Sequence, residues 1–172
     1  IRKVLLALDH AWTHPHILHR VVNPANIMLD KYGEVNLLVL GLAKSILEDS
    51  HLTISGTIVG TPYYMSPEQA KSQRDLDFRS DLYATGATLY HLLAGVPPFE
   101  GDGVVSILAK HVLEPLPPIR LRNASVSTPC AQLLETMLAK EPAQRQASYA
   151  AAAAQLVRYA KQADTAIFLV GH

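Results

Sequence analysis

Apolar residues recur at helical spacing along most of the chain. Val4, Leu5, Leu8 and Trp12 lie three or four positions apart, which predicts an amphipathic helix from Ile1 to about Trp12. The same spacing predicts four further helices, at 81–94, 102–113, 129–139 and 148–163. The chain is therefore expected to be mainly α-helical.

One region near the start of the chain has a different pattern. Two short apolar runs, Ile27–Leu29 and Val35–Leu38, flank a polar stretch that contains Gly33. This arrangement is typical of a β-hairpin with a glycine in its turn. A polar stretch rich in Ser, Thr and Gly follows at 45–61 and predicts a long loop. We therefore expect a helical bundle with one small hairpin.

Composition narrows the function classes. The length of 172 residues suits one domain, and 15 basic and 15 acidic side chains cancel. Without clustered Lys and Arg, nucleic-acid binding is not expected. No apolar run reaches the roughly 18–20 residues of a membrane span, so no membrane association is expected. A single cysteine, Cys130, which we expect to be buried, permits no intrachain disulfide and fits a cytoplasmic location.

Several short motifs occur along the chain in an order that can be compared with the motifs of known enzyme families. They are His19-Arg20 with Asn26, Val39-Leu40-Gly41, Gly60–Met65, Ser66-Pro67-Glu68, Arg79–Tyr83, Gly95–Phe99 and Glu141–Arg145. The first, second and fourth stand where protein kinases have H-R-D-L-x-x-x-N, D-F-G and A-P-E. Over residues 1–160 the chain resembles the C-terminal lobe of a protein kinase, most closely the bacterial Ser/Thr kinases of eukaryotic type.

The resemblance implies a mainly α, protein-kinase-like C-lobe: a helical bundle with a small β-hairpin beside the catalytic loop. We expect this domain to cover residues 1–163, with a C-terminal tail at 164–172. The Gly-rich loop of kinases belongs to the N-lobe, and no G-x-G-x-x-G occurs in the chain. The N-lobe is therefore expected to be absent.

Three residues differ from the kinase pattern at positions that take part in catalysis in the resembled family. Val21 replaces the Asp that accepts the proton of the substrate hydroxyl, and Val39 replaces the Asp that holds Mg²⁺. Asn23 replaces the Lys that neutralises the transferring phosphate, whereas Asn26 is retained. ATP and Mg²⁺ serve the resembled family, but neither these nor another cofactor or metal is expected to bind here.

The residues that match structural positions of the family are retained. Asp81 matches the residue that hydrogen-bonds the catalytic-loop backbone, and Glu68 and Arg145 match a buried ion pair. Thr57 and Thr61 stand where related kinases carry an activation-loop phosphate and a substrate-facing threonine. Arg20 could pair with a phosphate at Thr57, or the segment could be a plain loop.

Two surfaces could meet a protein partner or a second copy of the chain. One is the N-lobe-facing surface around Trp12, Met28 and Leu40, which we expect to be exposed and partly apolar. The other is the helix at 102–113, which is either a docking face or ordinary packing. A group of histidines near the start of the chain could form a metal site. Because no carboxylate or Cys joins them, they could equally be exposed helix and loop residues, with His19 in the core. The members of this group are His10, His14, His16 and His19.

The sequence therefore favours a catalytically inactive protein-kinase-like domain that acts as a scaffold or interaction module. Two alternatives stay open. The chain could be the C-lobe fragment of a Ser/Thr kinase that needs an N-lobe for phosphoryl transfer. It could also be an engineered or remnant fold with no function of its own.

Overall fold

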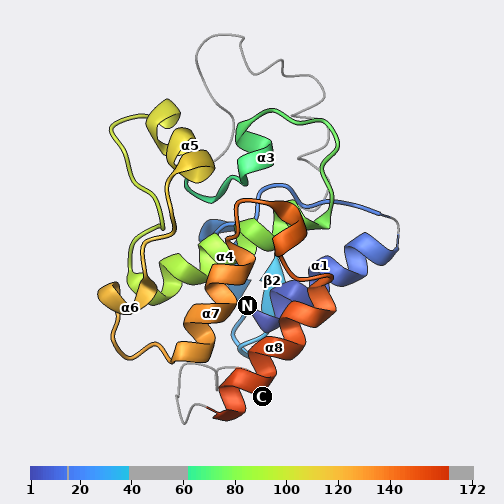
Figure 1. Ribbon diagram of the computed structural model, residues 1–172. Coiled ribbons are helices and arrows are strands. Elements are labelled where there is room, and N and C mark those ends of the chain that lie inside the picture. The colour runs from blue at the N-terminus through green and yellow to red at the C-terminus, as the bar shows by residue number, and fades with distance from the viewer. Residues whose placement is uncertain (15, 39–61, 163–172) are drawn as a thin grey trace.

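The computed structural model describes residues 1–14, 16–38 and 62–162, with side chains described as far as Tyr159. Figure 1 shows these residues as a helical bundle with one small hairpin, which is the mainly α architecture expected. The elements are α1 (Arg2–Thr13), η1 (Pro24–Asn26), β1 (Ile27–Leu29), β2 (Val35–Leu37), η2 (Pro62–Tyr64), α3 (Pro67–Ala70), α4 (Phe78–Ala94), α5 (Val104–Leu113), α6 (Ile119–Arg122), α7 (Thr128–Met137), η3 (Pro142–Gln144) and α8 (Tyr149–Gln162).

Helix α4 is the central element of the bundle. Every residue from Ser80 to Tyr90 is buried, so the helix is covered on all sides. The Asp77 side chain caps its start by accepting a hydrogen bond from the Arg79 N–H at 2.8 Å. Gly95 ends it in the left-handed conformation, at φ 77°.

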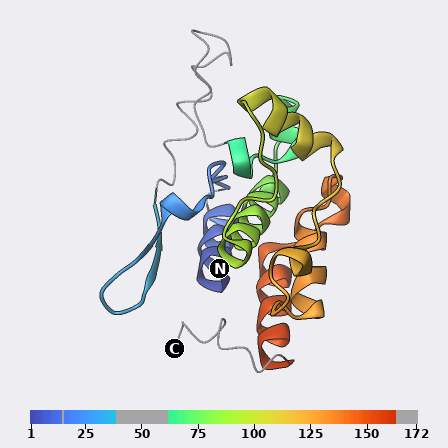
Figure 2. The ribbon, with the colours of Figure 1, turned by 90° about the vertical axis from the view of Figure 1, so that its left-hand side faces the viewer.

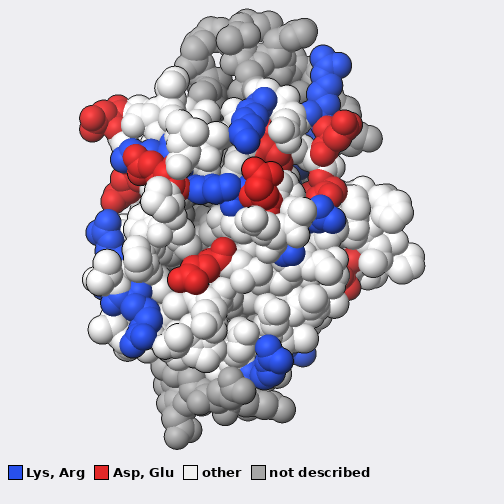
Figure 3. Space-filling view, viewed as in Figure 1, with Lys and Arg blue, Asp and Glu red and all other residues white. Residues whose placement is uncertain are grey.

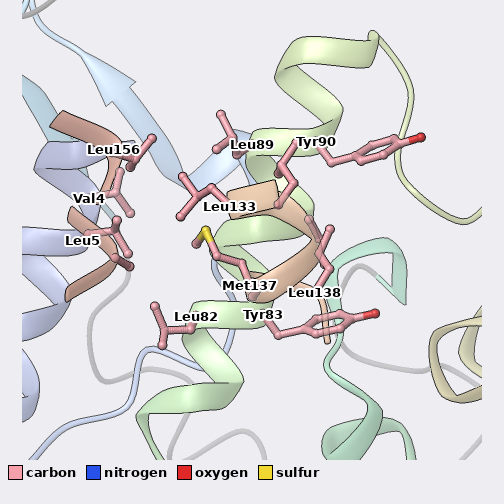
Figure 4. Packing of buried hydrophobic residues seen from close by; sticks show 14 of the residues in the cluster. Val4, Leu5, Leu82, Tyr83, Leu89, Tyr90, Leu133, Met137, Leu138 and Leu156 are labelled. Atoms are coloured by element: carbon pink, nitrogen blue, oxygen red, sulfur yellow. The ribbon is translucent and has the colours of Figure 1, made fainter. Parts of the chain in front are cut away.

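The hydrophobic core lies where α1, α7 and α8 pack around α4. Figure 4 shows Leu156 of α8 facing Val4 and Leu5 of α1, beside side chains of α4 and α7. Gly86 permits a close approach, because a Cβ on this residue would lie 2.8 Å from the Cβ of Met137 on α7. A small residue at this point therefore sets the distance between α4 and α7.

The hairpin lies at the margin of the bundle. Strands β1 and β2 are antiparallel, with Met28 opposite Asn36. The Asp30 carboxylate accepts hydrogen bonds from the N–H groups of Tyr32 and Glu34, and Gly33 supplies the positive φ of the turn. In Figure 2 the turn of the hairpin extends away from the helices.

Several element boundaries differ from those expected from periodicity. Helix α4 begins at Phe78 rather than Asp81, because Asp77 is its N-cap. Helix α5 begins at Val104 rather than 102. Helix α7 begins at Thr128 rather than 129 because Ser127 caps it, and it ends at Met137 rather than 139, with Leu138 as its C-cap. The short helices α3 and α6 were not expected. Residues 163–172, which include the expected tail, lie outside the described residues.

The described surface carries charges of both signs. Figure 3 shows Lys and Arg side chains interspersed with Asp and Glu on one face of the molecule. Within the described ranges, no helix combines the length and apolar character needed to cross a lipid bilayer.

Candidate functional site

The Asp81 carboxylate organises the backbone at the start of the catalytic-like loop, residues 19–26. It is fully buried and accepts hydrogen bonds from the N–H groups of His19 at 2.8 Å and Arg20 at 2.7 Å. The Tyr149 hydroxyl of α8 donates a third at 3.2 Å. Burial raises the pKa of Asp81, and the two backbone donors oppose that change. The first turn of α4 thus holds the loop in place.

Arg20 is held from both sides in an unusual conformation. Its φ of 67° lies in the left-handed region, which costs a non-glycine residue about 1–3 kcal/mol. Asp81 binds its N–H, while the Gln69 side-chain amide donates to its carbonyl oxygen at 3.0 Å. Gln69 itself belongs to the capping box of α3 with Ser66. Both α3 and α4 therefore determine the shape of this loop.

The two asparagines of the loop are turned onto one backbone carbonyl. The side-chain amides of Asn23 and Asn26 donate to the Val21 carbonyl oxygen at 3.2 and 2.8 Å. The Asn23 side-chain oxygen also accepts from the Asn26 N–H at 3.1 Å and so caps η1. Where the resembled family carries Lys, this chain has a neutral cap. No carboxylate occurs between residues 19 and 26.

The histidines do not converge on a common point. His19 is fully buried, and its Nε2 lies 2.8 Å from the Leu38 carbonyl oxygen. His16 instead contacts the carbonyl oxygen of Trp12. Among the residues described, no group of three or more His, Cys, Asp or Glu side chains is placed to hold a metal. His19 thus occupies the core position expected for it.

Glu68 and Arg145, 77 residues apart, form a buried two-pronged ion pair. The guanidinium Nη1 and Nη2 donate to the two carboxylate oxygens at 2.6 and 2.9 Å. The Ser80 hydroxyl donates to the same carboxylate at 2.7 Å. Burial alone would raise the pKa of Glu68, but the hydrogen bonds and charge of Arg145, with Ser80, lower it below its ordinary value. The pair joins α3 to the segment after η3.

Sequence reasoning missed a polar contact next to this pair. Tyr83 of α4 lies with its hydroxyl 2.8 Å from Nδ1 of His111 on α5, and both residues are buried. The signal was present in the sequence, because His111 lies one turn after Ile107 on the apolar face of its helix. A histidine at such a position must find a partner inside the protein.

The N-lobe-facing surface is only partly exposed. Met28 is 53% exposed, as expected, but Trp12 is half-buried and packs against Phe78 at 6.0 Å between ring centroids. On α5, Val105 is 80% and Leu113 78% exposed. Cys130 is buried, as expected. Other expected site residues, namely Val39, Leu40, Thr57 and Thr61, lie outside the described residues.

Comparison with known proteins gives a consistent family match. Residues 1–158 match the model of the protein kinase domain. The DNA damage-responsive serine/threonine-protein kinase RqkA of Deinococcus radiodurans is 45% identical over 147 residues, which is 86% of this chain and 22% of the relative. The serine/threonine-protein kinase pkn3 of Myxococcus xanthus is 42% identical over 165 residues, 91% of this chain and 30% of the relative. The serine/threonine-protein kinase PknB of Mycobacterium leprae is 39% identical over 143 residues, which is 83% of this chain and 23% of the relative. The chain thus spans about a quarter of the length of these relatives.

Proposed function

Because this chain belongs to the protein kinase domain family, we propose that it is a catalytically inactive kinase-fold module that serves as a scaffold or interaction domain. The main support for the proposal is the composition and hydrogen bonding of the catalytic-like loop. Val21 stands where a proton acceptor is needed, and the polar side chains of Asn23 and Asn26 are turned onto its carbonyl oxygen. The asparagine side chains are thus engaged with the loop backbone, and the Val21 side chain has no atom that can accept a proton.

The rate enhancements that the replaced residues would provide are large, which supports an inactive module rather than a slow enzyme. A positioned general base contributes about 10²–10⁴-fold to a rate. Removing one charge-stabilising group costs roughly another 10²–10³-fold. Val39 in place of the metal-binding Asp removes an oxygen ligand that Mg²⁺ requires. With Asn23 in place of Lys as well, no catalysed transfer is expected, and neither ATP nor Mg²⁺ should bind.

The retained contacts serve folding rather than chemistry. Asp81 fixes the loop backbone, and the buried Glu68–Arg145 pair ties α3 to the C-terminal helices. These contacts support a folded surface that does not depend on catalytic groups. A folded surface without chemistry is what a scaffold needs, and the partner we propose for it is another protein or a second copy of the chain.

The test is phosphoryl transfer from labelled ATP with Mg²⁺, measured for the chain alone and after a kinase N-lobe is supplied as a separate polypeptide. RqkA is the positive control. We expect no labelled product and no heat of ATP binding by calorimetry. Transfer that appears only with the added N-lobe would favour the alternative of a kinase C-lobe fragment.

The double variant Val21→Asp with Val39→Asp separates two explanations of an inactive result. If this variant with the N-lobe transfers phosphate and the parent does not, the replaced residues explain the inactivity. Transfer by the parent at a rate close to that of the double variant would overturn the proposal.

A further inference from the structure

Helix α5 is joined to the central helix through one histidine. Ile107 and His111 are its buried residues, and Nδ1 of His111 lies 2.8 Å from the Tyr83 hydroxyl on α4. The Phe99 ring stands edge-on to the imidazole, 4.9 Å away between centroids. Figure 1 shows α5 beside α3 and apart from α8. His111 is therefore the polar contact between α5 and α4 among the described residues.

Lys140 holds the C-terminal end of the same helix. Its Nζ donates to the carbonyl oxygens of His111 at 2.8 Å and Lys110 at 3.3 Å, and it lies 4.2 Å from the centroid of the Phe99 ring. A cation at the last carbonyls of a helix satisfies unpaired acceptors and opposes the helix dipole. The ammonium thus fixes α5 from the segment that follows α7.

These contacts form a closed ring with the buried ion pair. Arg145 donates from Nη2 to the Lys140 carbonyl oxygen at 3.1 Å, and its guanidinium carbon lies 4.9 Å from the centroid of the Tyr83 ring. The same guanidinium binds Glu68. The position of α5 is consequently linked through Tyr83 and Lys140 to the ion pair at the start of α3.

The surroundings of His111 favour the neutral imidazole. The ring is fully buried, and no described carboxylate forms a salt bridge with it. Burial and then the Lys140 charge lower its pKa to about 4, and the Tyr63 backbone opposes this. The titratable and charged groups around it are Tyr83 of α4, Tyr63 of η2, Lys140 and Arg145 flanking η3, Glu68 of α3, and Lys110 and Glu114 at the end of α5.

We propose that His111 is an acid-sensitive latch: the neutral ring holds α5 against α4, and protonation releases α5 while the rest of the bundle stays folded. A protonated imidazole only donates, so Nδ1 would no longer accept a hydrogen bond from the Tyr83 hydroxyl. It would also add a second cation next to Lys140. Release would displace the exposed apolar side chains Val105 and Leu113 together with the helix.

The experiment follows the backbone amides of the ¹⁵N-labelled chain by NMR while the pH falls from 7 toward 3.5. We expect the α5 amides of Ile107 and His111 to lose their native positions with a midpoint near pH 4, before the amides of α1 and α8 change. Simultaneous loss of all three helices at one pH would overturn the proposal.

Variants identify the group responsible. In His111→Gln, the α5 amides should keep their native positions until the bundle unfolds, and an unchanged transition would contradict the latch. His91→Gln is the matched control, because His91 also contacts a tyrosine hydroxyl, that of Tyr64, at 2.7 Å, yet lies on α4. It should leave the α5 transition where it is.

A second pair of variants decides the question even if His111→Gln does not fold. Lys140→Met removes the neighbouring cation and should move the α5 midpoint up by about one pH unit. Lys140→Arg keeps the charge and should leave the midpoint close to that of the parent. Equal midpoints for the two variants would overturn the latch.

Discussion

At the scale of single residues, the Glu68–Arg145 pair is expected to dominate stability. Removing one partner of a buried ion pair leaves the other charge uncompensated and costs about 3–5 kcal/mol. Glu68→Gln or Arg145→Met should each lower the free energy of unfolding by this amount in a urea titration. The double variant should lose less than the sum of the two single losses.

A surface ion pair in the same chain is the matched control. Lys3 and Glu34 are also in contact, at 2.7 Å, but the Glu34 side chain is 59% exposed. Such a pair contributes about 0–1 kcal/mol because water screens it. If Glu68→Gln costs no more than Glu34→Gln, the buried pair is not the structural tie that we infer.

His111 should make stability depend on pH. An unfolded histidine has a pKa near 6.5, whereas burial and the charge of Lys140 lower the pKa of His111 to about 4, so the unfolded chain binds more protons between these values. The contribution of His111 to the free energy of unfolding should therefore be fully present above pH 6.5 and should be lost as the pH is lowered toward 4. At 1.36 kcal/mol per pH unit, the loss is up to about 3 kcal/mol. Urea titrations at several pH values check this, and His111→Gln should flatten the dependence over that range.

At the scale of elements, the contact between α4 and α7 should tolerate little change. Gly86→Ala improves intrinsic helix propensity by about 1 kcal/mol. The new methyl group would nevertheless lie 2.8 Å from the Met137 Cβ and 3.2 Å from Leu138 Cγ, which forces the helices apart. Because overpacking costs about 1–3 kcal/mol, a net loss of roughly 1 kcal/mol is expected by urea titration.

Leu92→Ala on the same helix is the control, because Leu92 is largely exposed. It should change the free energy of unfolding by no more than about 0.5 kcal/mol, as is usual for surface residues. A stabilised Gly86→Ala variant would mean that α7 can move away without cost.

At the scale of the whole molecule, exposed apolar side chains predict association. Met28 and its neighbour Leu29 on β1 are 53% and 59% exposed. Because successive side chains of a strand point to opposite faces, each face of the hairpin offers one exposed apolar side chain to a partner. Sedimentation at increasing concentration should reveal self-association that the double variant Met28→Lys with Leu29→Lys weakens.

The α5 face provides the comparison. Val105→Lys with Leu113→Lys adds the same charge to another exposed apolar surface and should weaken association less. A parent chain that stays monomeric at all concentrations would contradict self-association and leave a different protein as the partner of the β1 surface.

The sequence was sufficient for the long helices and the hairpin, since their apolar periodicity is strong, but not for α3 and α6. Each of these has only four residues, too few for a period to appear. The contacts of Asp81 and of the Glu68–Arg145 pair could be predicted only from the family resemblance, because periodicity carries no information on partners 62 or 77 residues away. The position of His111 on the apolar face of its helix indicates that it is buried, but its partner Tyr83 depends on how α5 lies against α4, so the local pattern does not identify that partner.

The packing of α1 against α8 has a consequence for synthesis. Val4 and Leu5 face Leu156, which follows far later in the chain. After α1 has emerged from the ribosome, its apolar face therefore stays uncovered until α8 has been translated. Non-local contacts of this kind slow folding and expose chains to aggregation. Folding of this domain should accordingly finish only after translation of α8, and premature termination before Tyr149 should yield a chain that depends on chaperones.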